Sequence, residues 1–248
     1  MISEPDQGIA AAPVFILVRP QLAENVGTAA RAMMNCCIAE MRLVDPDEDH
    51  LCDRAVAASS GAAEILRNAK VFKTVKEAVG DLQKVYATTG RPRDMIKPVL
   101  TGQGMAKEIQ AGRRTGIKYG VLFGPERTGL ENEDLAYADA IVNIPLNPKH
   151  CSLNLAQAVL LAGYEIFRLS DATADKFLSM PNTEPANKAE TEHLFDHLEQ
   201  ELEVAGYFKS PEKRPRMMRN LRNIFMRADL TSQDVRTLHG VIADLAHR

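Results

Sequence analysis

The sequence predicts an α/β protein with a mostly parallel sheet that has helices on both faces, followed by a small helical domain. Short apolar runs alternate with stretches of helical periodicity through the first 169 residues. Strands that alternate with helices build parallel sheets. Beyond residue 190, apolar residues recur at helical spacing. The expected strands are residues 14–18, 41–44, 71–72, 84–88, 119–123 and 141–144.

The expected helices of the first domain lie between these runs. Residues 152–169 are expected to form about five helical turns, with Ser152 as the N-cap. Residues 53–67 are rich in alanine, and Gly61 interrupts them. The other helices of this domain are expected at residues 24–35, 75–79 and 102–113.

Composition divides the chain into four segments. Residues 1–12 are expected to be a flexible leader, and residues 13–169 the α/β domain. Residues 170–190 are rich in Asp, Ala, Thr, Asn and Pro without periodicity, which is typical of a linker. Residues 191–248 are expected to form the helical domain.

The overall composition excludes several classes of protein. The 248 residues carry a formal net charge of -3, so any surface for nucleic acid must come from a local basic cluster. No apolar run approaches the roughly 20 residues of a membrane span, and the first residues lack the features of a signal peptide. The four cysteines match neither a zinc site nor a redox pair, so reduced thiols and a cytoplasmic location are expected. His193 and His197 have metal-ligand spacing, but no third ligand accompanies them, and no metal is expected.

Polar residues follow the strands that end at Phe123 and Ile144. Gly124-Pro125-Glu126 breaks the first strand, and the second leads through a proline-rich loop to Ser152 at a helix start. Because ligands of parallel α/β sheets bind at the carboxyl ends of the strands, this edge is the expected binding site. The free N–H groups of the helix start would favour negative charge there.

Three stretches of the chain, in this order, resemble the motifs of the SpoU (TrmH-type) branch of SPOUT RNA 2′-O-ribose methyltransferases. Residues 25–31 are similar to N-x-G-x-x-x-R, and residues 123–130 to F-G-x-E-x-x-G-L. Residues 144–145 and 152–156 are similar to I-P and S-L-N-L-A. The resemblance covers residues 13–169. It implies a trefoil knot near the end of that domain and S-adenosyl-L-methionine as the methyl donor.

The resemblance also implies roles for particular residues. Arg31 is proposed as the base in this family. We interpret it as an electrostatic clamp on phosphate and on the developing oxyanion, since a guanidinium stays protonated. Gly27 shares a helix face with Arg31, so a nucleotide could approach over it. For Arg127, a structural ion pair and a functional role are equally supported. The expected catalytic residues are Asn25, Arg31, Glu126, Ser152 and Asn154, and the expected cofactor-binding residues are Thr88, Thr89, Gly90, Gly124, Ile144, Cys151, Ser152 and Leu153.

A basic cluster near Tyr207 and Phe208 predicts a surface for RNA in the helical domain. Seven basic residues against Glu212 give +6, a one-sided charge that favours the RNA backbone. The expected RNA-binding residues are Arg91, Arg93, Lys213, Arg214, Arg216, Arg219 and Arg222.

The helical extension resembles that of the TrmJ-type members of the family. This implies tRNA as the partner, with methylation at anticodon-loop nucleotide 32. The resemblance further implies a homodimer through the knot region, in which the first motif of one chain completes the site of the other. Residues 152–169 are the candidate interface.

Three alternatives remain open. The same chemistry could act on another tRNA site or on ribosomal RNA, or the chain could be a catalytically silent RNA-binding or assembly protein. A nucleotide-dependent dehydrogenase would suit a parallel sheet, but no G-x-G-x-x-G follows a strand.

Overall fold

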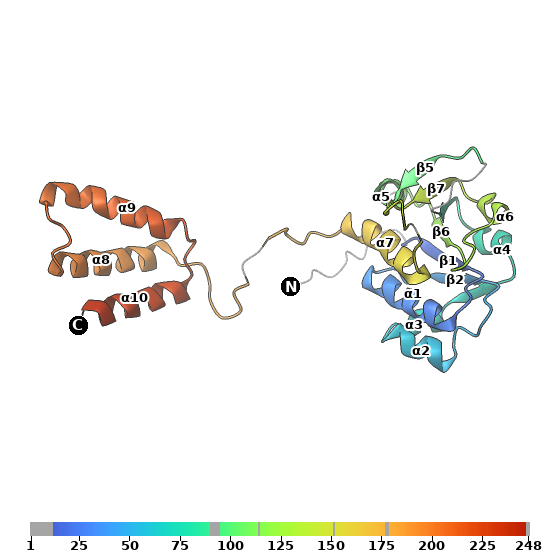
Figure 1. Ribbon diagram of the computed structural model, residues 1–248, viewed down its shortest axis with the longest axis horizontal. Helices are drawn as coiled ribbons and strands as arrows, with labels where there is room; N and C mark the ends of the chain where they lie inside the picture. The colour runs from blue at the N-terminus through green and yellow to red at the C-terminus, as the bar shows by residue number, and fades with distance from the viewer. Residues whose placement is uncertain (1–11, 90–94, 114, 151, 177–178, 247–248) are drawn as a thin grey trace. The chain divides into compact units, whose positions relative to one another are not determined.

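The protein consists of two compact units that divide after Ala172, each described here by itself (Figure 1). The computed structural model describes residues 12–89, 95–113, 115–150, 152–176 and 179–246. The first unit is built on a seven-stranded sheet in the order β3-β2-β1-β6-β4-β7-β5, and every pair is parallel. The strands are β1 (Val14–Val18), β2 (Met41–Val44), β3 (Lys70–Phe72), β4 (Lys84–Thr88), β5 (Val99–Thr101), β6 (Tyr119–Phe123) and β7 (Ala140–Asn143).

Helices cover both faces of this sheet, as the alternating pattern predicts. In β1, Phe15 and Leu17 belong to one apolar cluster, and Ile16 and Val18 to the other, because successive side chains point to opposite faces. The first cluster includes α1 (Ala23–Asn35), α2 (Asp53–Ser59), α3 (Ala63–Arg67), α5 (Gly102–Arg113) and α7 (Leu155–Arg168); the second includes α4 (Val75–Val79) and α6 (Asn132–Leu135).

The sequence-based elements match this architecture with a few differences. Residues 53–67 form two helices, α2 and α3, and the interruption expected at Gly61 is confirmed, since Gly61 adopts a φ of 99° between them. Neither β5 nor α6 was expected. The parallel sheet with helices on both faces is confirmed, and the trefoil knot stays a prediction.

The strand order decides where the site lies. β6 lies between β1 and β4, so segments distant in the sequence end side by side. Phe123 of β6 is in register with Leu17 of β1, and Thr88 of β4 with Val142 of β7. The carboxyl ends of β1, β6, β4 and β7 therefore form one edge, from which the loops that carry the motifs emerge.

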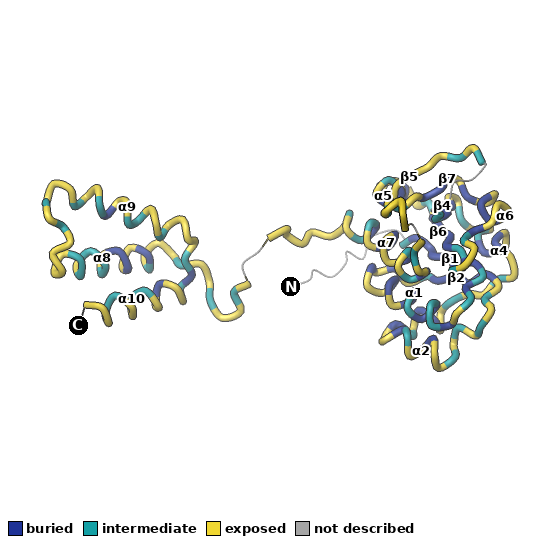
Figure 2. Tube along the Cα trace, viewed as in Figure 1, coloured by how far each residue is buried: buried dark blue, intermediate teal, exposed yellow. Residues whose placement is uncertain are grey.

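The second unit is a small helical domain with a thin core. Its helices are α8 (Lys188–Val204), the 3₁₀ helix η1 (Pro211–Lys213), α9 (Arg214–Met226) and α10 (Ser232–Ala246). Only Leu194, Phe195, Met218 and Val235 are buried apolar residues among those described in this unit, and Figure 2 shows mostly exposed helices here. Among the described residues, no helix has the length and apolar character of a membrane span.

Candidate active site

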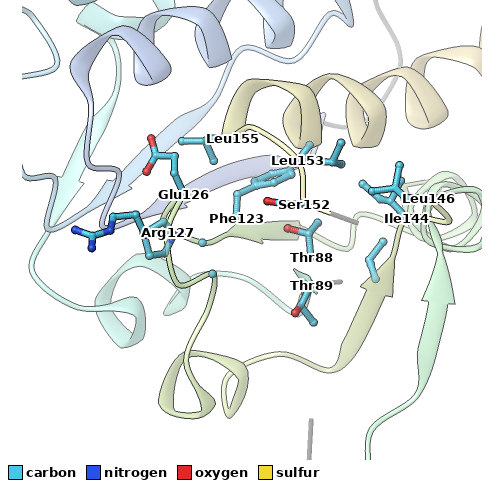
Figure 3. A pocket seen from close by; sticks show the side chains of 15 residues that line it. Thr88, Thr89, Phe123, Glu126, Arg127, Ile144, Leu146, Ser152, Leu153 and Leu155 are labelled. Atoms are coloured by element: carbon cyan, nitrogen blue, oxygen red, sulfur yellow. The ribbon is translucent and has the colours of Figure 1, made fainter. Parts of the chain in front are cut away.

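A cavity of about 270 Å³ lies at the carboxyl ends of β6, β4 and β7. Figure 3 shows Thr88 and Thr89 on one side, Ser152 and Leu153 opposite, and Glu126 with Arg127 at one end. Its lining comes from four segments: Thr88 and Thr89; Phe123, Gly124, Pro125, Glu126, Arg127 and Gly129; Val142, Ile144 and Leu146; and Ser152, Leu153, Leu155 and Ala158. The three distant motifs thus contribute unequally, since the second and third line the cavity and the first does not.

The walls of the cavity suit a nucleoside. Ile144, Leu146 and Leu153 are half-buried and offer apolar contact. The Thr88 hydroxyl donates to the carbonyl of Leu122 at 2.9 Å, so its proton is engaged while its oxygen can still accept. Apolar walls with a few fixed polar groups are typical of small-molecule sites.

The loop after β6 folds back tightly on itself. Gly129 has a φ of 69°, and its N–H donates to the carbonyl of Pro125 at 2.9 Å. A Cβ on Gly124 would lie 2.3 Å from the Leu130 nitrogen. Gly124 does line the cavity, but the space beside its Cα is filled by its own loop, not reserved for a cofactor as the resemblance implied.

A chain of side-chain hydrogen bonds joins all three motifs within one chain. The Asn25 amide donates to Glu126 Oε1 at 2.6 Å, and the Asn154 amide donates to Asn25 Oδ1 at 3.0 Å. The second carboxylate oxygen of Glu126 accepts from the Gln21 N–H at 3.2 Å. Asn25 therefore belongs to the site of its own chain, which differs from the expectation that the whole first motif acts in the partner's site.

The N-cap of α7 is Asn154, and the expectation of Ser152 is wrong. Asn154 Oδ1 accepts from the Ala156 N–H at 2.8 Å, and the Asn154 N–H donates to Gln157 Oε1 at 3.0 Å, a reciprocal capping box. Ser152 precedes the helix by three residues and is exposed beside the cavity. Its hydroxyl is therefore not needed for capping and is available to a ligand.

Gly27 and Arg31 do not share an open face. A Cβ on Gly27 would lie 2.2 Å from the Ala55 carbonyl oxygen, so this glycine allows α2 to pack against α1. Arg31 is exposed, does not line the cavity of its own chain, and makes no hydrogen bond or ion pair with another described residue. The nucleotide approach expected over Gly27 is excluded by that helix contact.

Sequence reasoning missed a second link between the segments that follow β1 and β6. Arg19, directly after β1, donates to both carboxylate oxygens of the buried Asp134, at 3.1 and 2.5 Å. The hydrogen bond to Asp134 raises the pKa of Arg19. The two residues are 115 positions apart, and no local pattern in the sequence joins them.

In the second unit, the basic residues expected to bind RNA fall into two groups. Arg214 pairs with Glu199 at 2.7 Å and Glu203 at 2.9 Å, and Arg222 pairs with Glu192 at 2.6 Å. These two arginines hold α9 on α8, so the expectation of a one-sided cluster is wrong for them. The exposed members without an ion pair to a described residue are Lys213, Arg216 and Arg219. Gly90, Arg91, Arg93 and Cys151 lie outside the described residues.

His193, His197 and His239 lie together in the second unit. His197 Nδ1 lies 2.8 Å from His239 Nδ1, and the His193 ring lies 4.9 Å from that of His239. Burial and the two neighbouring histidines lower the pKa of His239. In the part of the chain that the structure describes, no group of three His, Cys, Asp or Glu side chains has the geometry to hold a metal ion.

Comparison with known proteins agrees with this fold. The model of the SpoU rRNA Methylase family matches residues 12–164, and the model of the tRNA methyltransferase TrmJ, C-terminal domain, matches residues 189–248. The chain therefore belongs to the SpoU methylase family and is a methyltransferase, with the C-terminal domain found in TrmJ.

Named relatives extend over nearly the whole chain. The tRNA (cytidine/uridine/adenosine-2′-O-)-methyltransferase TrmJ of Pseudomonas aeruginosa is 34% identical, over 92% of this chain and 91% of that protein. An uncharacterized tRNA/rRNA methyltransferase of Haemophilus influenzae is 30% identical, over 94% of each. The crystal structure of TrmJ from Z. mobilis ZM4 has a TM-score of 0.78 and 42% identity, and covers 95% of this chain and 100% of that one.

A more distant solved structure shares the fold. The SpoU methyltransferase AviRb from Streptomyces viridochromogenes, crystallised in complex with the cofactor AdoMet, has a TM-score of 0.53 and 17% identity, and covers 67% of this chain and 60% of that one.

Proposed function

We propose that this protein transfers the methyl group of S-adenosylmethionine to a ribose 2′-hydroxyl of tRNA, at nucleotide 32 of the anticodon loop. Family membership and the names of the relatives support methylation of tRNA. The observation that carries the chemistry is the cavity where β4, β6 and β7 end, with the Ser152 hydroxyl beside it. A tRNA substrate also favours the cytoplasm as the location.

The methyl donor is S-adenosylmethionine, as in the SpoU methylases. When bound, it supplies a methyl group on a sulfonium, which is already electrophilic. We place its adenosine against Ile144, Leu146 and Leu153, with Thr88 and Thr89 on the opposite side, because these residues form the apolar walls and polar floor of the cavity. Gly90 and Cys151 remain predicted contacts outside the described residues.

The chain's own residues position the acceptor. The bound donor would supply its methyl group to the ribose oxygen, and the hydroxyl proton would pass to phosphate or water. Ser152 donates to the developing charge on the ribose oxygen, and Arg31 clamps the phosphate and the same oxygen. Asn25, Glu126 and Asn154 act as positioning residues, since their hydrogen bonds fix the loops around Ser152. Such positioning is worth several kcal/mol.

Arg31 would reach a cavity only across a homodimer. It projects from α1, which packs beside α7, and it lies three residues before the exposed Met34. On α7, Leu160, Leu161 and Tyr164 are 41, 37 and 51% exposed, and they share one side of the helix. An apolar face of this kind marks an interface. A second copy is the partner we propose, because it would bring its own Arg31 to a site that lacks one.

The second unit would bind the tRNA backbone through the exposed side of α9. Arg216, Arg219 and Arg227 lie on this side with the polar Asn220 and Asn223, and none of the three arginines pairs with a described acid. Unpaired arginines that share one helix side are suited to successive phosphates.

Methyl transfer to purified RNA tests the function directly. The protein with tritiated S-adenosylmethionine should label bulk tRNA from cells that lack the gene, and it should not label tRNA that already carries the modification. Mapping of 2′-O-methylation should place the label at nucleotide 32. Label at another nucleotide of tRNA would contradict nucleotide 32 as the position but would still support 2′-O-methylation of tRNA.

Ribosomal RNA is the second candidate substrate, favoured by the name of the Haemophilus influenzae relative. The same assay with ribosomal RNA separates the two substrates. Absence of transfer to either RNA, with S-adenosylhomocysteine still bound in calorimetry, would identify a catalytically silent protein.

A further inference from the structure

Resting on the proposed function, we propose that Arg127 binds a phosphate of the RNA substrate at the rim of the methyl-donor cavity. Arg127 is exposed and belongs to the cavity lining. Its role follows from how the loop presents it, from the pairing of the acids around it, and from the direction of its side chain.

Arg127 lies in a turn whose backbone is held in place. Residues 125–129 form a closed turn, because the Gly129 N–H donates to the Pro125 carbonyl at 2.9 Å. Pro125 and Leu130 are buried on either side of the turn, and Gly124 has no free space beside it. The backbone at Arg127 therefore has little freedom, and the position of an anion that the side chain could hold is restricted.

Three acids of this region, Glu126, Glu131 and Asp134, are already paired. Both oxygens of Glu126 accept hydrogen bonds, from Asn25 and from the Gln21 N–H. Asp134, and at 3.5 Å Glu131, pair with Arg19. Arg127 makes no hydrogen bond or ion pair with any described residue. The alternative of a structural ion pair in a tight turn is therefore excluded within the described chain, and a positive charge is left without a partner at the rim.

The direction of the side chain favours RNA over the methyl donor. Figure 3 shows the guanidinium pointing outward, away from the cavity interior that Ile144 and Leu153 line. An anion that it holds would thus lie outside the cavity. The ribose that presents a 2′-hydroxyl in RNA carries a phosphate on the neighbouring 3′-oxygen, so a phosphate must come close to this rim. A guanidinium fits two phosphate oxygens at once.

The test separates RNA binding from cofactor binding with the substitutions Arg127→Ala and Arg127→Lys in the full chain. We expect Arg127→Ala to weaken tRNA binding about tenfold in filter binding, and to reduce the slope of log K against log salt by about 1. The KM for tRNA should rise, while the Kd for S-adenosylhomocysteine and the melting temperature stay unchanged. Arg127→Lys should recover part of the affinity, since it keeps the charge but loses the two-point contact.

Arg67→Ala is the matched control, because Arg67 is exposed at the end of α3 and does not line the cavity. It removes the same charge and should leave the affinity for tRNA and the salt slope near those of the unmutated protein. Unchanged tRNA affinity in Arg127→Ala would overturn the proposal, and so would a weaker affinity for S-adenosylhomocysteine. Failure of the unmutated protein to methylate tRNA would instead contradict the proposed function, and binding to the RNA that it does methylate would then decide the role of Arg127.

Discussion

The Asn25 side-chain amide donates a hydrogen bond of 2.6 Å to Glu126, across 101 positions of sequence. It joins the helix after β1 to the loop after β6, two strands that are neighbours only in the folded sheet. Asn154 extends the link to the start of α7. One amide thus ties α1 to two of the segments that line the cavity, the loop after β6 and the start of α7.

Replacing this amide by a carboxylate should damage the site more than removing it. Asn25→Asp would set two carboxylates against each other at hydrogen-bond distance, which raises the pKa of one of them. We expect a larger loss of S-adenosylhomocysteine affinity at pH 8 than for Asn25→Ala, and the gap should narrow as the pH falls and the pair takes up a proton. Calorimetry at pH 8 and pH 6 measures this. Asn35→Asp, at the exposed end of the same helix, is the control.

Arg31 should act in the partner's cavity. Arg31→Ala and Ser152→Ala homodimers should each lose turnover. Arg31→Ala should keep its affinity for S-adenosylhomocysteine, because the contacts proposed for Arg31 are with the RNA phosphate and the ribose oxygen and not with the methyl donor. Co-expression of the two variants should restore about a quarter of the activity, since half of the dimers would be mixed and each would hold one intact site. No recovery in mixed dimers purified with two affinity tags would assign Arg31 to its own chain.

Gly27 should tolerate no side chain. A Cβ there would meet the Ala55 carbonyl oxygen at 2.2 Å, and a backbone atom cannot move without shifting α2. Gly27→Ala should destabilise the first unit by about 1–3 kcal/mol in urea unfolding. Gly104→Ala in α5 is the matched substitution, because its Cβ would meet only ordinary contacts at 3.5 Å; it should be neutral or stabilise by up to about 1 kcal/mol. Equal effects of the two substitutions would contradict this account.

The arginines of α9 should separate into stabilising and RNA-binding residues. Arg222 bonds Glu192 and lies 4.7 Å above the Phe195 ring, so Arg222→Ala should destabilise the second unit by about 1 kcal/mol. Arg219→Ala, three residues earlier on the exposed side, should leave stability unchanged, weaken tRNA binding several-fold and reduce the salt slope by about 1. Thermal melting and filter binding of both variants test this, and reversed effects would contradict the assignment.

The second unit should lose stability in mild acid. The pKa of His239 is lowered in the folded protein, by burial and by His197 and His193, so the unfolded chain binds more protons below the ordinary pKa of about 6.5. This contribution to stability is complete above about pH 6.5 and decreases as the pH falls from there toward the folded pKa. Thermal melting at pH 7.5 and 5.5 measures the difference, which His239→Gln should reduce. His150→Gln, in an exposed loop of the first unit, should not change it.

The sequence alone predicted the sheet, most helices and the place of the cavity, because these depend on local patterns. Strands and helices follow from apolar periodicity, and the residues after Phe123 and Ile144 belong to one edge whenever parallel strands end together. The three motifs indicated the SpoU family. The short elements β5 and α6 were missed.

Only the tertiary structure decided how individual side chains are used. The sequence placed the N-cap at Ser152. The backbone geometry of α7 assigns the cap to Asn154, which leaves the serine hydroxyl beside the cavity. The sequence predicted one basic surface in the helical domain. In the folded unit, acids of α8 pair with Arg214 and Arg222. Periodicity records what each residue does within its own helix or strand. Which partner neutralises a charge or accepts a proton depends on chain segments that meet only after folding.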